Sequence, residues 1–275
     1  PGKAQQLSVM TLRNGATVYI WEDKSKPDVF GMIAFKVGSV DDPEQYTGLA
    51  HYLEHVMFKG TQTIDALDWE KEKPIYEKII AKYDERAALS DPAAREAIDK
   101  EINDLTREAA QYAAGNEFSL LVDHMGGQGL NASTGYDQTE YHNSFPPSQL
   151  EKWLEIYSER LIDPVFRGFQ TELEAVYEEY NMYNDDRGSR MREFIYEQAF
   201  GDHPYARPII GLPEHLKNPQ LSKLIDFYNT WYGPQNMSII LVGNIDAKEA
   251  IPMIRDKFER VPRRAEIHRE KKPVR

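Results

Sequence analysis

The sequence predicts an α+β fold: a mixed, largely antiparallel sheet with helices packed on one face, plus an inserted helical hairpin. The first observation is an alternation of apolar and polar residues on both sides of Asn14-Gly15, a strong signal for a turn between two strands. The second is a series of longer segments with apolar residues three and four positions apart, which is typical of amphipathic helices. The third is composition, because 275 residues with 41% apolar and 11% aromatic content can bury the core of one large or two small domains.

The expected elements follow in order along the chain. Residues 8–12 and 16–21 form the first hairpin, and residues 29–37 are apolar enough for a central strand. A helix follows Gly48, and residues 69–113 then carry apolar side chains at helical spacing among many charged ones. The remaining expected elements are a short helix ending near Gly126, a hairpin of strands 130–134 and 139–145, helices 147–161, 172–183, 221–231 and 247–258, and a strand at 237–242.

The pentapeptide His51-Tyr52-Leu53-Glu54-His55 has the spacing of a catalytic zinc site. On a helix, residues four apart share a face, so His51 and His55 can bind one metal ion while Glu54 projects from the same side. Two imidazoles and one further ligand leave a zinc coordination position for water, from which a nearby carboxylate can take a proton. This is the H-x-x-E-H order of inverzincins. An amphipathic helix with histidines at its boundary has the same spacing, but the apolar flanks predict a buried helix, whose polar groups need partners.

A third ligand is sought in the acid-rich helical stretch at 171–180. Glu172 and Glu179 are seven residues apart and therefore fall on one face, two turns from each other. Glu179 can bind the metal while Glu172 holds a ligating histidine. An acidic run of this kind is also typical of a solvated helix face, so the spacing alone leaves both interpretations open. Met182 and Tyr183, just beyond this stretch, are expected in the core.

Several ordered motifs together resemble the N-terminal domain of the pitrilysin/insulinase-type zinc metallopeptidases, the family that includes mitochondrial processing peptidase. The similar segments are 48–61 (GLAHYLEHVMFKGT), 126–134 with Thr139 and Tyr141, 172–179, 203–205, 208–211, 232–237 and 242–244. The resemblance implies a zinc cofactor held by His51, His55 and Glu179, with Glu172 supporting a ligand. It also implies that Asn131 and Ala132 lie where an extended peptide substrate adds to the edge of the sheet.

The chain departs from the family pattern in one respect. The second histidine and the ligand glutamate are 179 − 55 = 124 residues apart, more than is usual in the family. The excess is assigned to a helical insert at about residues 65–113, in which Asp91-Pro92 has the pattern of an N-cap followed by proline at the first helical position. A hairpin packed on the surface is the simplest interpretation, and a lid or a partner-docking arm is the alternative.

Composition excludes other classes of function. The formal charge of −12 argues against a nucleic-acid surface, and no stretch approaches the length of a membrane span. The chain has no cysteine, so a zinc ion must be held by nitrogen and oxygen. An exported location such as the periplasm is favoured, because a chain that begins Pro1-Gly2-Lys3 can be one whose leader has been removed; cytoplasmic and organellar locations stay open.

The domain organisation predicted is a peptidase domain at 1–261, followed by a charged linker at 262–275. The resemblance implies that family members pair two similar domains around a closed chamber, so a second pitrilysin-like domain or subunit is expected as a partner. The isolated chain is therefore expected to bind zinc but to cleave peptides poorly.

The function predicted is that of a zinc metalloendopeptidase, which hydrolyses peptides or unfolded protein segments through a metal-bound water with Glu54 as general base. The alternatives left open are a non-catalytic scaffold subunit of a pitrilysin-like complex, a zinc-stabilised module that binds peptides without cutting them, and a hydrolase of non-peptide esters. The presence of Glu54 favours the enzyme, since a scaffold needs no general base.

Overall fold

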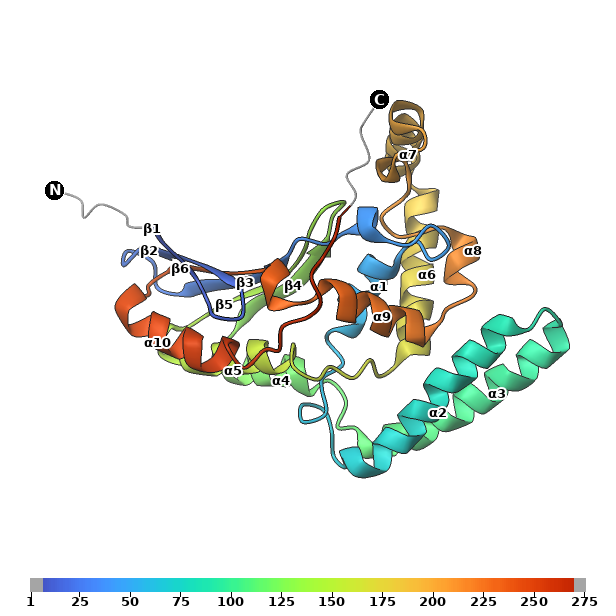
Figure 1. Ribbon diagram of the computed structural model, residues 1–275, viewed down its shortest axis with the longest axis horizontal. Coiled ribbons are helices and arrows are strands. Elements are labelled where there is room, and N and C mark those ends of the chain that lie inside the picture. Colours follow the sequence, from blue (N-terminus) through green and yellow to red (C-terminus); the bar gives the residue numbers. More distant parts are fainter. Residues whose placement is uncertain (1–6, 270–275) are drawn as a thin grey trace.

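A six-stranded sheet forms one half of the molecule in the computed structural model, which describes residues 7–269 (Figure 1). Its strand order is β1-β2-β6-β3-β5-β4; only β2 and β6 are parallel, so the prediction of a mixed, largely antiparallel sheet is confirmed. The strands are β1 (Leu7–Thr11), β2 (Thr17–Glu22), β3 (Val29–Phe35), β4 (Gln128–Thr134), β5 (Thr139–Phe145) and β6 (Met237–Gly243). Asn14 lies in the turn between β1 and β2, and its side-chain amide donates to the carbonyls of Phe258 and Val261, which ties this hairpin to the end of the last helix.

Three helices cover one face of the sheet and leave the other face without helices (Figure 1). They are α4 (Glu117–His124), α5 (Leu150–Glu159) and α10 (Ala247–Phe258). The core between these layers is centred on Trp153 of α5, whose ring stacks on Phe145 and lies against Gly31 of β3. A Cβ atom at Gly31 would come within 2.5 Å of the indole, so only glycine lets the helix approach the sheet this closely.

A second group of helices lies beside the β4 end of the sheet. Helix α1 (Leu49–Val56) contacts β4, α6 (Phe169–Asp185) and α9 (Leu221–Trp231), and its residues Ala50, Leu53 and Val56 are fully buried. The predicted burial of this helix is therefore confirmed. Beyond α6 the chain forms α7 (Arg187–Phe200) and the short α8 (Pro213–Leu216).

The predicted insert is a helical hairpin of α2 (Trp69–Ala88) and α3 (Pro92–Ala109), which projects from the body of the molecule (Figure 1). Asp91 caps α3 as expected, since its carboxylate accepts a hydrogen bond from the Ala94 amide. The base of the hairpin is fixed by a buried ion pair, in which Arg167 donates to both carboxylate oxygens of Glu72 at 2.6 and 2.8 Å. Tyr83 of α2 packs edge-on against Phe169 at the start of α6.

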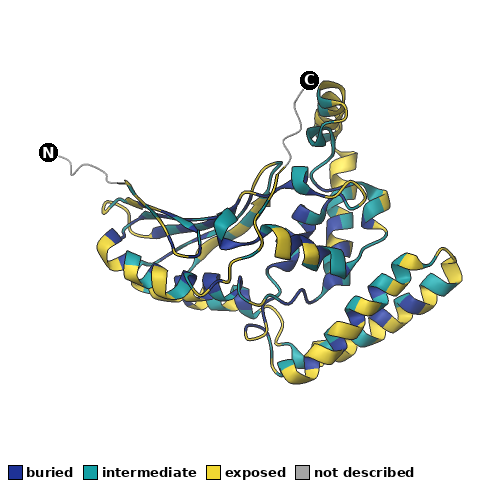
Figure 2. Cartoon of the chain, viewed as in Figure 1, coloured by how far each residue is buried: buried dark blue, intermediate teal, exposed yellow. Residues whose placement is uncertain are grey.

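One expectation about the end of the acidic helix is wrong, and the helix that follows it was not predicted. Met182 and Tyr183 are not in the core, because the last turns of α6 extend past their packing partners and leave these side chains 73% and 46% exposed. Helix α7 was not expected at all. It has no buried residue (Figure 2): Met191, Phe194 and Ile195 stand at helical spacing in the sequence, but their side chains are exposed.

Residues 262–269 form no helix or strand but lie back along the domain. The side-chain amide of Gln235 donates to the carbonyls of Arg264 and Ala265 at 2.7 and 2.9 Å, and the guanidinium of Arg269 binds Asp41 at 3.0 Å. The rest of the predicted linker, residues 270–275, lies outside the described residues. Among residues 7–269, we find no helix with both the length and the apolar character needed to cross a lipid bilayer.

Candidate metal centre

Helix α1 presents His51 and His55 on the same side, one turn apart, with their ring centroids 4.8 Å from each other. The helix is held at its N-terminus by Asp42, a buried side chain whose carboxylate accepts from the amides of Gly48 at 2.7 Å and Ala50 at 2.9 Å. These bonds satisfy amide groups that have no partner within the helix. The position of both imidazoles therefore depends on a cap outside the motif.

Glu179 of α6 faces both histidines, although it is 124 residues from His55 in the sequence (179 − 55). Its Oε2 atom lies 3.6 Å from Nε2 of His51 and 3.6 Å from Nε2 of His55. Ligand atoms on a tetrahedral zinc ion, at bond lengths near 2.1 Å, are separated by about 3.4 Å. Both separations from Glu179 are close to this value, and the three donor atoms lie within 4.8 Å of one another, so these residues could hold one metal ion.

Glu172, two turns earlier on α6, lies between His55 and Lys59. Its carboxylate is 3.3 Å from Nδ1 of His55 and 2.6 Å from the ammonium of Lys59. A proton on Nδ1 that is donated to Glu172 leaves the Nε2 lone pair of His55 free for a metal. Burial alone would raise the pKa of Glu172, but the hydrogen bonds from His55 and Lys59 lower it, so the carboxylate is charged at neutral pH.

The two imidazoles are in different electrostatic environments. Burial lowers the pKa of His51 to about 3, so its ring is neutral and ready to act as a ligand at neutral pH. Burial also acts to lower the pKa of His55, but the hydrogen bond to Glu172 and the charges of Glu54, Glu172 and Glu179 raise it overall. Metal binding therefore competes with a proton at His55 but not at His51.

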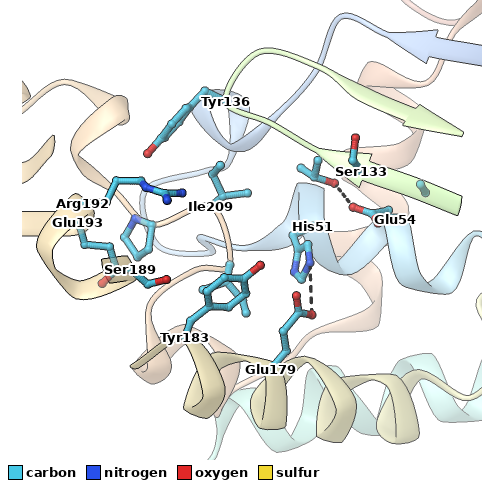
Figure 3. A pocket seen from close by; sticks show the side chains of 14 residues that line it. His51, Glu54, Ser133, Tyr136, Glu179, Tyr183, Ser189, Arg192, Glu193 and Ile209 are labelled. Atoms are coloured by element: carbon cyan, nitrogen blue, oxygen red, sulfur yellow. Dashed lines mark hydrogen bonds and ion pairs between the residues drawn. The ribbon is translucent and has the colours of Figure 1, made fainter. Parts of the chain in front are cut away.

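The side chain of Glu54 extends from α1 toward β4, an edge strand of the sheet. Its Oε2 atom accepts a hydrogen bond of 2.5 Å from the hydroxyl of Thr134 on β4 (Figure 3). Burial raises the pKa of Glu54, and the Thr134 bond opposes this only in part. A carboxyl with a raised pKa is better matched to taking up a proton near neutral pH. Thr134 was not singled out from the sequence, since a threonine in a strand carries no signal of such a contact.

The two residues expected to bind substrate lie on the edge strand but on opposite faces of it. Ala132 lines the same pocket as His51, Glu54 and Glu179, whereas Asn131 alternates to the other face of the strand. The Asn131 side chain accepts a hydrogen bond of 2.9 Å from the amide of Ala132. Strand β4 ends the strand order, so its outer backbone groups are available to a further strand.

The pocket that contains His51, Glu54 and Glu179 has a volume of about 320 Å³ and extends from the metal-binding residues to α7 (Figure 3). No residue of the hairpin α2–α3 lines it, so in the described part of the chain the insert is not a lid over this pocket. The side chains that sequence reasoning missed are Tyr136, Tyr183, Ser189, Arg192 and Glu193, together with residues 208–210. Residues 208–210 belong to one of the segments that resemble the family, but the α7 residues have no comparable signal.

Two family models match the chain. The model described as insulinase (peptidase family M16) matches residues 17–73 and 105–212, and the model described as peptidase M16 inactive domain matches residues 220–275. The unmatched residues 74–104 fall within the hairpin α2–α3, in agreement with its interpretation as an insert.

Curated relatives and solved structures agree with these matches. A probable zinc protease, PqqL of Escherichia coli strain K12, is 26% identical over 94% of this chain and 23% of its own length. Zinc protease PqqE of Helicobacter pylori is 24% identical over 91% of this chain and 46% of its own length. In fold, the chain is similar to the first half of the periplasmic protease PqqL from Escherichia coli (TM-score 0.74, 24% identity, 98% of this chain and 49% of that one). It is also similar to pitrilysin (TM-score 0.72, 22% identity, 99% of this chain and 24% of that one). The chain thus spans about a quarter to a half of the length of these proteins.

Proposed function

The chain belongs to the insulinase (peptidase M16) family, and on this basis we propose that it is the catalytic domain of a zinc-dependent endopeptidase that cleaves peptides or unfolded protein segments. The observation that carries the proposal is the convergence of Nε2 of His51, Nε2 of His55 and Oε2 of Glu179 beside the carboxylate of Glu54. Relatives named as zinc proteases support both the metal and the reaction class.

Each residue of the proposed site has a defined role. His51, His55 and Glu179 hold the zinc ion, which supplies Lewis acidity when bound, and Glu172 orients His55. Glu54 takes a proton from the attacking water and delivers it to the leaving amine, while Thr134 fixes the direction in which its carboxylate points.

Substrate binding is proposed to use the free edge of β4. A peptide in an extended conformation adds to this edge through main-chain hydrogen bonds, which hold it regardless of its sequence. The amide of Ala132 already has a partner in the Asn131 side chain, so a substrate carbonyl that binds there replaces this contact. Asn131 then becomes free to turn toward the peptide.

Full activity is proposed to require a second homologous domain or subunit. The pocket is lined by residues of α1, α6, α7 and β4, by Tyr136 and by residues 208–210, all within one domain. The relatives are two to four times as long as this chain, which leaves room for further domains of similar size. Within this proposal, residues 1–261 are the peptidase domain and the segment after residue 261 is its connection.

Replacement of Glu54 by Gln tests the proposed reaction. Zinc content is measured by elemental analysis, and cleavage of an unfolded protein is followed by mass spectrometry of the new termini. We expect Glu54→Gln to retain zinc but to cleave at least about 100-fold more slowly, since it loses the general base. Glu178→Gln, an exposed change on α6, is the matched control and should cleave at the wild-type rate. The comparison is made in the presence of the second domain or subunit; zinc-loaded wild type that cleaves no faster than Glu54→Gln under that condition would overturn the enzyme and favour a scaffold or a peptide-binding module.

A further inference from the structure

One wall of the pocket is made by α7, the helix that faces the metal-binding residues from across the cavity (Figure 3). Ser189, Arg192 and Glu193 of this helix line the pocket, and the guanidinium of Arg192 points toward Ile209 at its centre. Among the described residues that line the pocket, Arg192 is the one Lys or Arg side chain. It forms no ion pair within residues 7–269.

The orientation of the α7 face that carries Arg192 is set by the packing of other residues of this helix. Tyr196, four residues later, stacks on Tyr136 at a centroid distance of 5.5 Å and an interplanar angle of 11°. Phe200 packs edge-on against Tyr205, whose hydroxyl donates to Asp137 at 2.6 Å. These contacts join α7 to the loop that follows β4, so the face of α7 that carries Arg192 is held toward the pocket.

With the proposed zinc ion bound, the metal side of the pocket is close to neutral, whereas the α7 side carries a positive charge. A divalent ion offsets the charges of Glu54 and Glu179, and the two imidazole ligands are neutral. Arg192 then remains as a cation on the opposite wall. Glu193 follows it in the chain, but adjacent residues of a helix are rotated by about 100°, and Figure 3 shows the two side chains pointing in different directions.

We propose that Arg192 is a specificity-determining residue, which binds a carboxylate of the peptide on the α7 side of the scissile bond. A peptide that lies along β4 passes Thr134 and then reaches the part of the pocket lined by Tyr136, Ser189 and Arg192. A guanidinium forms paired hydrogen bonds with a carboxylate in a fixed plane, so Arg192 selects carboxylates over neutral amides. The carboxylate comes from an Asp or Glu side chain or from the C-terminus of a short peptide. This inference rests on the proposed function, because it assigns a subsite of the same pocket.

The test measures binding of fluorescent peptides to the zinc-loaded Glu54→Gln chain, so that substrate is not consumed. A neutral ten-residue parent peptide with blocked ends is varied by placing Glu, Gln or Lys at each position in turn. A second set differs only in a free or an amidated C-terminus. We expect a carboxylate to strengthen binding about tenfold. Either one of the Glu peptides binds more tightly than the Gln peptide changed at the same position, or the peptide with a free C-terminus binds more tightly than its amidated form. The pair that shows the difference identifies the source of the carboxylate.

The added change Arg192→Gln should reduce this preference to about one. Arg190→Gln removes the same charge from the opposite side of the same helix and should leave the preference intact. Equal binding of the Glu and Gln peptides at every position and of the two C-terminal forms, or a preference that survives Arg192→Gln, would overturn the inference. Tighter binding of Lys peptides that depends on Glu193 would overturn it as well.

The outcomes separate this inference from the proposed function. Peptides that bind with the expected preference but are not cut by the zinc-loaded wild type, even with the second domain or subunit present, would refute the peptidase and leave the role of Arg192 standing. Cleavage by the wild type without any preference for a carboxylate would do the reverse. The absence of measurable binding by any peptide would refute both.

Discussion

At the scale of single residues, the proposed metal centre depends on Oε2 of Glu179, which lies 3.6 Å from Nε2 of both His51 and His55. Glu179→Gln removes a charged ligand and should lower zinc affinity by more than about 100-fold, whereas Glu172→Gln only loosens His55 and should lower it about 10- to 100-fold. Affinity is measured by competition with a chromophoric chelator, with Glu178→Gln as the unchanged control. Equal affinity of wild type and Glu179→Gln would place the third ligand elsewhere.

Asp42, which caps α1, should make stability depend on pH. Burial raises its pKa from 3.8 to about 7, although the amides of Ala50 and Gly48 oppose the shift. A pKa that is raised on folding means that the folded chain binds the proton more tightly than the unfolded chain does. The stabilisation that comes from protonated Asp42 is therefore complete below pH 3.8 and is lost as the pH rises through 7. The unfolding free energy of wild type minus that of Asp42→Asn, measured in urea, should therefore fall between about pH 4 and pH 7 and be constant above. A difference that rises over this range would contradict the assignment.

Sequence reasoning found the residues of the candidate site that share a local pattern and missed those that do not. His51, Glu54 and His55 follow from helical spacing alone, because three and four residues make one turn. Thr134 and Arg192 approach the site only through tertiary packing, for which local spacing gives no signal. The assignment of Asn131 and Ala132 to substrate binding stays a prediction; the strand turns their side chains to opposite faces, but a peptide that adds to the edge of β4 would bind the main chain of both.

At the scale of elements, the hairpin α2–α3 depends on the buried ion pair of Glu72 with Arg167. Glu72→Gln leaves a buried guanidinium without its counter-charge and should lower the unfolding free energy by about 3–5 kcal/mol. The same substitution at Glu96, which is exposed on α3 and paired with Lys100, should change it by less than about 0.5 kcal/mol. Denaturant unfolding of both variants provides the measurement, and equal effects would show that the pair is not what fixes the hairpin.

Elements with complete local signals were predicted closely. Helices α9 and α10 have the bounds expected from their apolar periodicity, and the hairpin of β1 and β2 forms around Asn14-Gly15 as the turn signal indicates. Helix α7 was missed although Met191, Phe194 and Ile195 stand three and four positions apart; in the structure these side chains are exposed and do not pack on a core. The order of the strands was also beyond local patterns, since the insertion of β6 between β2 and β3 joins residues more than 200 positions apart.

At the scale of the whole molecule, residues 262–269 fix the direction in which the chain leaves the domain. Gln235→Ala removes two hydrogen bonds to the carbonyls of residues 264 and 265, so this segment should open more often. Trypsin should then cut after Arg263 or Arg264 about tenfold faster, because two hydrogen bonds contribute about 1–3 kcal/mol together. Gln111→Ala, an exposed change in the insert region, is the control. Equal rates would show that other contacts hold the segment.

The long separation of the metal-binding residues has a consequence for biosynthesis. A ribosome that adds about 5–20 residues per second needs about 6–25 s to pass from His55 to Glu179, since Glu179 is 124 positions further along the chain (179 − 55). During that interval the nascent chain offers two imidazoles but no third ligand from α6. The hairpin α2–α3, the strands β4 and β5 and helix α5 are all synthesised before the proposed centre can be completed. At the proposed centre, zinc would therefore be bound late in synthesis, and a bound ion would report that α1 and α6 have come together.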